Sequence, residues 1–236
     1  MDRSRSPLVI FDCDGVLVDS EPLSIRVLID AVRAHGGELD EAEAYQRFLG
    51  RSLATMVTVL DEDFGIKADS AFLGKMRHDL YDRFRHGLQA IEGIADALDL
   101  LDWPHCVASS SQPERIRLSL GLTGLIDYFE PHIFSATMVE NGKPAPDLFL
   151  HAAREMGMQP QDCIVIEDSP AGILAAKRAG MTVFAFTGGS HADRDEYRAE
   201  IAALSPDVVF DAMSDLIHLA EQHRQSKGGL PARPAP

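Results

Sequence analysis

The stretch VIFDCDGVL, residues 9–17, decides how the rest of the chain is interpreted. Its first three residues are apolar without a polar break, which predicts a short buried strand. Because side chains alternate between faces in an extended chain, Asp12 and Asp14 can point the same way, about 6.5 Å apart. Two buried negative charges are costly unless they are paired, and a hard divalent cation such as Mg²⁺ is the ordinary remedy. Gly15 permits a sharp turn beyond the pair, although a strand followed by a simple Asp-Gly turn fits the same residues.

The composition excludes several classes of function. The 236 residues carry a formal net charge of −15, which opposes binding to nucleic acid or an anionic membrane, where basic residues supply most of the affinity. No apolar run approaches the length that spans a bilayer, and no signal-peptide apolar region precedes the first strand. Cys13, Cys106 and Cys163 lie in apolar runs without metal-ligand spacing. We therefore expect a cytoplasmic protein with buried, reduced thiols.

Residues 20–87 carry apolar residues at helical spacing and no convincing strand. Ser20 is a plausible N-cap of the first helix, with Pro22 in its first turn, and Gly36 would end that helix. Two further helical patterns follow, the second of them beginning after Asp69. These spacings suit a small bundle, so we predict an all-helical unit.

From residue 88 onward, short apolar runs alternate with helical patterns. The predicted strands are 105–108, 132–135, 163–166, 182–186 and 207–210. The predicted helices are 113–121, 146–157, 170–179, 193–203 and 213–224. This alternation predicts an α/β fold: a doubly wound, Rossmann-like parallel sheet that includes the first strand and carries the helical unit as an insertion. We expect an α/β core of residues 1–19 plus 88–226, a helical insertion of residues 20–87, and a disordered Gly- and Pro-rich tail of residues 227–236.

Polar side chains follow several of the predicted strands, where an open α/β sheet binds its ligands. Asp12 and Asp14 follow the first strand, Ser-Ser-Ser (109–111) follows the second, and Glu-Asp-Ser-Pro (167–170) follows the strand at 163–166. Lys143 lies between them, before a helix. The edge would therefore hold four acids, hydroxyls and a lysine, which indicates a metal site beside an anion site. Each stretch alone also fits a simple alternative: a capping loop, a solvated lysine or an acidic helix start.

With these stretches together, the sequence resembles the haloacid dehalogenase-like hydrolase superfamily. It looks like the branch with a small helical cap, around β-phosphoglucomutase and phosphoglycolate or sugar-phosphate phosphatases. Residues 12–20 match the first family motif, Ser109 the second, residues 143–147 the third, and residues 167–169 with Gly172 and Gly180 the fourth. The resemblance covers residues 7–220, and the order and spacing of the motifs carry it.

The resemblance implies a role for each acidic position. Asp12 would be the nucleophile that takes the phosphoryl group as an aspartyl-phosphate. Asp14 would be the general acid and base, which asks it to hold and release a proton near neutral pH. Magnesium would be the cofactor, and its charge would let Asp12 approach a phosphate. Its ligands would be Asp12, the backbone carbonyl of Asp14, Asp168, and Glu167 directly or through water.

The resemblance also implies how the substrate is held. Ser109, the backbone amide of Ser110 and Lys143 would bind the non-bridging phosphate oxygens. The helical insertion would be a cap that closes over the site and reads the leaving group. Arg51 and Glu21 are candidate specificity residues, with a solvated arginine and a helix-terminal acid as the alternatives.

The leading hypothesis is a magnesium-dependent phosphatase for a small phosphomonoester, such as a sugar phosphate or a phosphogluconate. A phosphomutase is a weaker alternative, because Ser24, Leu49 and Leu53 stand where β-phosphoglucomutase carries a histidine, a lysine and an arginine. Dehalogenation is disfavoured by the presence of Asp14, and a signalling receiver domain by the inserted helices. A sugar-phosphate sensor is the non-enzyme alternative. We expect a small phosphorylated metabolite as partner, no nucleic acid or membrane, and a monomer or weak homodimer.

Overall fold

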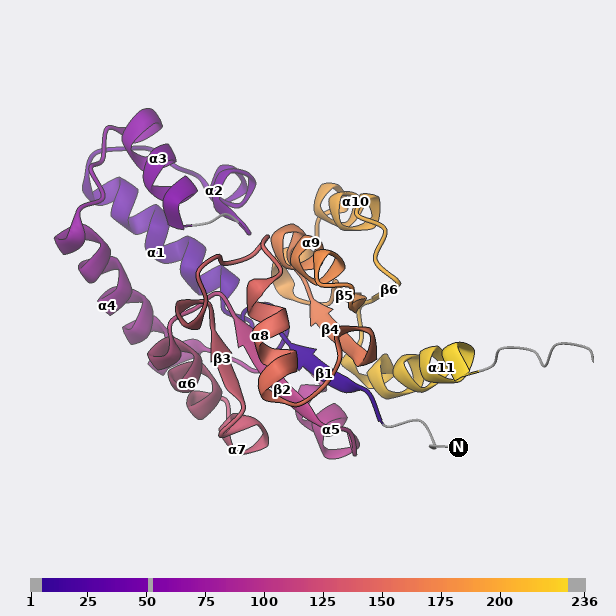
Figure 1. The fold of residues 1–236 in the computed structure, drawn as a ribbon. Coiled ribbons are helices and arrows are strands. Elements are labelled where there is room, and N and C mark those ends of the chain that lie inside the picture. Colours follow the sequence, from indigo (N-terminus) through magenta and orange to yellow (C-terminus); the bar gives the residue numbers. More distant parts are fainter. Residues whose placement is uncertain (1–5, 51–52, 229–236) are drawn as a thin grey trace, which may run out of the picture.

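The computed structural model describes residues 6–50 and 53–228 and shows a parallel sheet covered by helices, with further helices to one side (Figure 1). Within the described residues the sheet has six strands in the order β3-β2-β1-β4-β5-β6, and every neighbouring pair is parallel. The strands are β1 (Leu8–Phe11), β2 (His105–Ser109), β3 (Ile133–Ser135), β4 (Cys163–Glu167), β5 (Thr182–Phe186) and β6 (Val208–Phe210). The predicted doubly wound α/β class is confirmed, and β1 lies at the centre.

The central strands are apolar throughout because both faces of the sheet are covered. In β1, Val9 and Phe11 belong to one apolar cluster, and Leu8 and Ile10 belong to the cluster on the opposite face. Helices α5 (Ile94–Asp99), α6 (Pro113–Leu122), α7 (Ile126–Phe129) and α11 (Leu216–Gly228) contribute to the Phe11 side. Helices α8 (Asp147–Glu155), α9 (Pro170–Arg178) and α10 (Asp195–Ala203) contribute to the other side.

The longer helices of the core agree with their predicted ranges to within a few residues. Helices α5 and α7 were missed because six and four residues are too short to show a helical period. The last helix, α11, reaches Gly228, two residues into the predicted tail, and residues 229–236 lie outside the described residues. No described helix combines the length and apolarity needed to cross a membrane.

The insertion contains α1 (Glu21–Ala34), α2 (Glu41–Phe48), α3 (Leu53–Phe64) and α4 (Ser70–Gly87), which lie together to one side of the sheet (Figure 1). Asp40 and Asp69 cap α2 and α4 by accepting hydrogen bonds from backbone N–H groups. The helices bury their own apolar cluster, which includes Leu28, Val32 and Leu60. The division into core and cap at residues 19/20 and 87/88 stays a prediction.

Candidate active site

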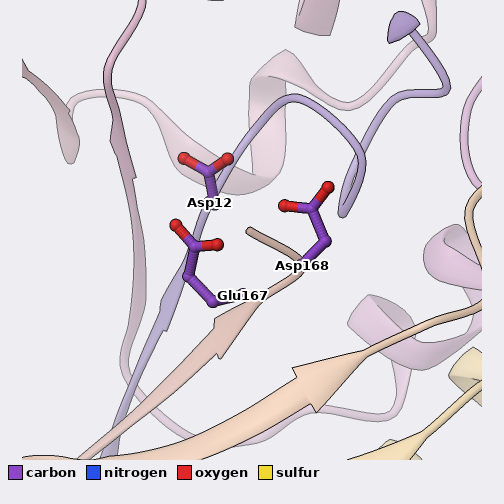
Figure 2. A group of neighbouring side chains, drawn as sticks. All are labelled: Asp12, Glu167 and Asp168. Atoms are coloured by element: carbon purple, nitrogen blue, oxygen red, sulfur yellow. The ribbon is translucent and has the colours of Figure 1, made fainter. Parts of the chain in front are cut away.

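Three acidic side chains meet where β1 and β4 end. Asp12 directly follows β1, Glu167 is the last residue of β4, and Asp168 follows it. The two strands are parallel neighbours with Phe11 opposite Ile166, so their ends lie side by side. One carboxylate oxygen from each acid lies within 4.8 Å of the others, and Figure 2 shows all three carboxylates facing the same space. All three residues are buried, so the sequence-based prediction that they share one edge is confirmed by the geometry.

Lys143 is the positive charge inside this cluster. Its Nζ donates to Oδ1 of Asp12 and to Oε1 of Glu167, each at 2.7 Å. The side chain is only 4% exposed and its ammonium lies 4.8 Å from the centre of the Phe149 ring. The alternative of a solvated surface lysine is therefore excluded. Asp12 and Glu167 raise the pKa of Lys143 against the effect of its burial, so the lysine remains charged.

The cluster contains more negative than positive charge. Burial is the largest effect on Asp12 and raises its pKa well above the usual value; Lys143 opposes this, and Glu167 and Asp168 add to it. Burial likewise raises the pKa of Glu167, with Asp168 adding to the rise and Lys143 opposing it. Three carboxylates thus meet around one lysine, which bonds to two of them, and their hard oxygen donors are those that Mg²⁺ prefers. The residues present fit a magnesium ion.

Asp14 faces a different set of partners from Asp12. Its Oδ1 accepts hydrogen bonds from the Ser20 hydroxyl (2.6 Å) and from Arg115 (2.8 Å), and its Oδ2 accepts one from the Ser111 hydroxyl (2.7 Å). Burial raises the pKa of Asp14, but Arg115 and the hydroxyl groups outweigh burial and hold the pKa below the usual value. Asp14 is thus an ionised acceptor in this conformation, whereas the sequence-based expectation was a proton exchanged near neutral pH.

The Ser109–Ser111 turn begins at the last residue of β2 and lies beside Asp14. Ser109 is buried and its Oγ accepts a hydrogen bond from the backbone N–H of Ser111 at 3.1 Å. Ser135, at the end of β3, donates to the Ser111 carbonyl at 2.7 Å. Ser110 is exposed. The turn is therefore fixed by hydrogen bonds at the same edge as the acids, which is where a phosphate-binding loop is needed.

Of the two candidate specificity residues, the structure describes Glu21 and does not describe Arg51. Burial raises the pKa of Glu21 to about 7, with Asp14 adding to the rise and the positive charges of His191 and Arg115 opposing it, so this carboxyl belongs to the electrostatic environment of the site. Arg51 lies outside the described residues. Leu49, two residues before Arg51 in the sequence, is buried and packs in the apolar cluster on the Ile10 face, so the end of α2 touches the core.

Arg115 and His191 were not assigned to the site from the sequence, and Ser20 and Ser111, although they lie in stretches placed at this edge, were given no contact with Asp14. Ser20 was expected to cap α1 through its side chain, but no such capping bond forms and its hydroxyl donates to Asp14 instead. His191 follows β5, and its Nε2 lies 2.9 Å from Oδ2 of Asp168. The rule that ligands meet the carboxyl ends of strands points to this loop as well, because it follows β5.

The fold and the site together define a Rossmann-like α/β enzyme whose carboxylates, buried lysine and serine turn are the groups used in phosphoryl transfer. The chain belongs to the haloacid dehalogenase-like hydrolases: a model of that family matches residues 7–180. This confirms the family that the four motifs predicted.

Named relatives agree with this assignment. The chain is 33% identical over 189 residues to the 6-phosphogluconate phosphatase of Escherichia coli K12, covering 80% of this chain and 86% of that protein. A haloacid dehalogenase-like protein of unknown function from Agrobacterium tumefaciens C58 superposes with a TM-score of 0.83 at 33% identity, over 94% of this chain and 100% of that one. A family hydrolase from Deinococcus radiodurans R1, solved with bound phosphate and sodium, gives a TM-score of 0.74 at 30% identity, over 92% and 97%. The protein is a phosphoric monoester hydrolase.

Proposed function

We propose that the protein is a magnesium-dependent phosphatase that releases phosphate from a small sugar phosphate or sugar-acid phosphate, such as a phosphogluconate, through an aspartyl-phosphate. The observation that carries this proposal is the contact of Lys143 with Asp12 inside a buried cluster that also contains Glu167 and Asp168. A buried carboxylate with a fixed cation beside it is suited to approach a phosphate that would otherwise repel it. The phosphogluconate phosphatase named among the relatives supports the substrate class.

Asp12 is the proposed nucleophile. One carboxylate oxygen forms a bond to phosphorus while the bond from phosphorus to the leaving oxygen breaks, and the leaving oxygen takes a proton from Asp14. Water then attacks the phosphorus of the aspartyl-phosphate, the bond from phosphorus to the Asp12 oxygen breaks, Asp14 takes a proton from that water, and inorganic phosphate leaves. Asp14 is ionised in this conformation and accepts from Ser20, Ser111 and Arg115, so to act as the acid it must take up a proton and exchange part of these contacts for the substrate oxygen.

The other side chains hold the phosphate and the metal. Lys143, the Ser109 hydroxyl and the backbone N–H of Ser110 bind the non-bridging phosphate oxygens in this proposal. The magnesium ligands are Asp12, Asp168, the backbone carbonyl of Asp14, and Glu167 directly or through water. When bound, the ion supplies positive charge that offsets the excess of carboxylates and the charge of the phosphate. The bound phosphate in the Deinococcus relative supports an anion site on this fold.

The cap completes the proposal. Glu21 faces the charges of the site from the start of α1, and Arg51 follows Leu49 by two residues in the sequence; both are proposed to contact the leaving group. A small metabolite as substrate, a cytoplasmic location and a monomeric or weakly dimeric state stay predictions.

Phosphate release from a panel of phosphomonoesters, with and without Mg²⁺, tests the proposed function. Wild type and the variant Asp12→Asn are compared, with Asp102→Asn as a matched control because Asp102 is exposed and outside the site. We expect magnesium-dependent release that Asp12→Asn abolishes and Asp102→Asn retains. Phosphate release that persists in Asp12→Asn would overturn the assignment of Asp12 as the nucleophile. Conversion of a sugar 1-phosphate to a 6-phosphate faster than phosphate release would favour a mutase.

A further inference from the structure

His191 is buried against the acidic cluster although no family motif includes it. It lies in the 3-10 turn Ser190–Ala192, after β5, and is 1% exposed. Its Nε2 lies 2.9 Å from Oδ2 of Asp168. This is an ion-pair distance, and neither ring nitrogen has a well-aligned hydrogen bond to a described residue. The polar contact of this ring is therefore with the carboxylate of Asp168. The position of the ring must be fixed by packing.

Two glycines make room for the imidazole. A Cβ atom on Gly189 would lie 2.7 Å from Cε1 and 2.8 Å from Nδ1 of His191. A Cβ atom on Gly15, in the turn after Asp14, would lie 2.9 Å from Cε1 of His191 and 2.0 Å from Oδ2 of Asp168. All four distances are shorter than side-chain contacts allow, so a side chain at Gly189 would displace the ring and one at Gly15 would displace the Asp168 carboxylate and the ring. The ring therefore occupies a slot formed by the loops after β1 and β5.

Tyr197 closes this slot and also contacts Asp168. Its ring meets His191 edge to face, with centroids 5.5 Å apart at 76°. Its hydroxyl donates to the backbone carbonyl of Asp168 at 3.1 Å. The segment after β5 thus holds Asp168 at two points, through the backbone by Tyr197 and through the carboxylate by His191.

We infer that His191 is a positioning residue that fixes the carboxylate of Asp168 for magnesium binding. The inference rests on the proposed magnesium site. A ring nitrogen packed 2.9 Å from one carboxylate oxygen limits rotation of the Asp168 carboxylate, so the other oxygen stays available to the cation. Groups that hold a metal ligand in this way commonly contribute about 10- to 100-fold to metal affinity. The role needs an N–H donor at the position of Nε2, which both a neutral imidazole protonated on Nε2 and a charged imidazolium provide.

Magnesium affinity measured by calorimetry on the full chain, without substrate, tests this inference. His191→Leu removes the N–H, and we expect Mg²⁺ to bind about 10- to 100-fold more weakly. His191→Gln keeps an N–H donor of similar reach, and we expect it to restore most of the affinity. Gly189→Ala keeps the imidazole but displaces it, and since φ of Gly189 is −68° the backbone itself accepts alanine. We expect this variant to bind magnesium more weakly as well.

Two controls separate positioning from a general effect on folding. His151→Leu removes a histidine of α8 that packs on Phe134, away from the acids. Gly121→Ala adds a Cβ in α6 that meets nothing within 4 Å. Both should bind Mg²⁺ as wild type does.

Equal affinity in wild type, His191→Leu and Gly189→Ala would overturn the inference and leave the phosphatase proposal standing. A wild type that binds no magnesium would instead remove the magnesium site, and this inference with it. If His191→Leu does not fold, His191→Gln and Gly189→Ala decide the outcome. Magnesium affinity that falls equally in both variants would contradict the need for an N–H donor.

Discussion

Arg115 holds Asp14 by a hydrogen bond of 2.8 Å between Nη2 and Oδ1, across 101 residues of sequence. Arg115 also lies over the ring of Phe84, near the end of α4, with 5.3 Å between the guanidinium carbon and the ring centre. Its positive charge is the largest influence that lowers the pKa of Asp14. Arg115 therefore favours the ionised form of the residue that we propose as the acid.

Replacing Arg115 by Met should raise the pKa of Asp14, because burial then acts without the opposing charge. A protonated Asp14 would persist to higher pH, so the alkaline limb of kcat/KM against pH should move up by about one to three pH units. Phosphate release measured across the pH range checks this shift. Arg117→Met is the matched control, since Arg117 lies on the same helix and pairs with the exposed Glu130. An alkaline limb that stays in place in Arg115→Met would contradict the role given to Arg115.

Lys143→Met should destabilise the protein strongly, because Asp12 and Glu167 would lose their shared partner while remaining buried. Removal of one member of a buried ion pair costs about 3–5 kcal/mol of unfolding free energy. The loss of unfolding free energy should become smaller as the pH falls, because protonation of Asp12 and Glu167 removes their uncompensated negative charge. Added Mg²⁺ should stabilise Lys143→Met more than wild type, because a cation can partly replace the missing ammonium.

Urea unfolding at several pH values, with and without Mg²⁺, measures these effects. Lys75→Met is the control, because Lys75 is 75% exposed and pairs with Asp79 in solvent. Its effect should stay within about 0.5 kcal/mol. A Lys143→Met variant as stable as Lys75→Met would show that the lysine does not balance the buried acids.

The acids of the site were predictable because each follows an apolar run that can only be a buried strand. Once β1 and β4 are recognised as parallel neighbours, Asp12 and Asp168 must meet. Arg115 and His191 could not be found in this way, since neither helix spacing nor a local motif marks them. Arg115 is 101 residues from Asp14 in sequence, and the role of His191 depends on the absence of side chains at Gly15 and Gly189. Packing between distant loops creates both contacts.

Gly172→Ala and Gly121→Ala should have opposite effects on stability, although both lie in helices. In α6, alanine at 121 meets nothing within 4 Å and should stabilise by roughly 0.5–1 kcal/mol through its higher helix propensity. In α9, a Cβ at 172 would lie 1.6 Å from Oε1 of Glu167 and must displace that carboxyl. Thermal unfolding and magnesium affinity of the two variants check this. If Gly172→Ala also stabilises and binds Mg²⁺ normally, Glu167 is not fixed at its present position.

Glu21→Gln should change how stability depends on pH. Burial raises the pKa of Glu21 to about 7, whereas the unfolded carboxyl titrates near its ordinary value of about 4.3. The folded state therefore binds this proton more tightly. Its contribution to stability is complete below the unfolded pKa and is lost as the pH rises towards 7. Glutamine cannot ionise, so Glu21→Gln should exceed wild type in unfolding free energy above pH 7.

The expected gain is about 1–3 kcal/mol, because Glu21 is half-buried and solvent screens part of the full effect of its pKa shift. Urea unfolding at pH 5 and pH 8 measures it, and the two proteins should differ little at the lower pH. Glu41→Gln is the matched control, since Glu41 begins α2 in an exposed position and loses the same charge without burial. Parallel stability curves for wild type and Glu21→Gln would mean that Glu21 is ionised as easily in the folded protein as in the unfolded chain. Its place among the charges of Asp14, Arg115 and His191 would then have no energetic consequence, and the reason to propose Glu21 as a reader of the leaving group would be lost.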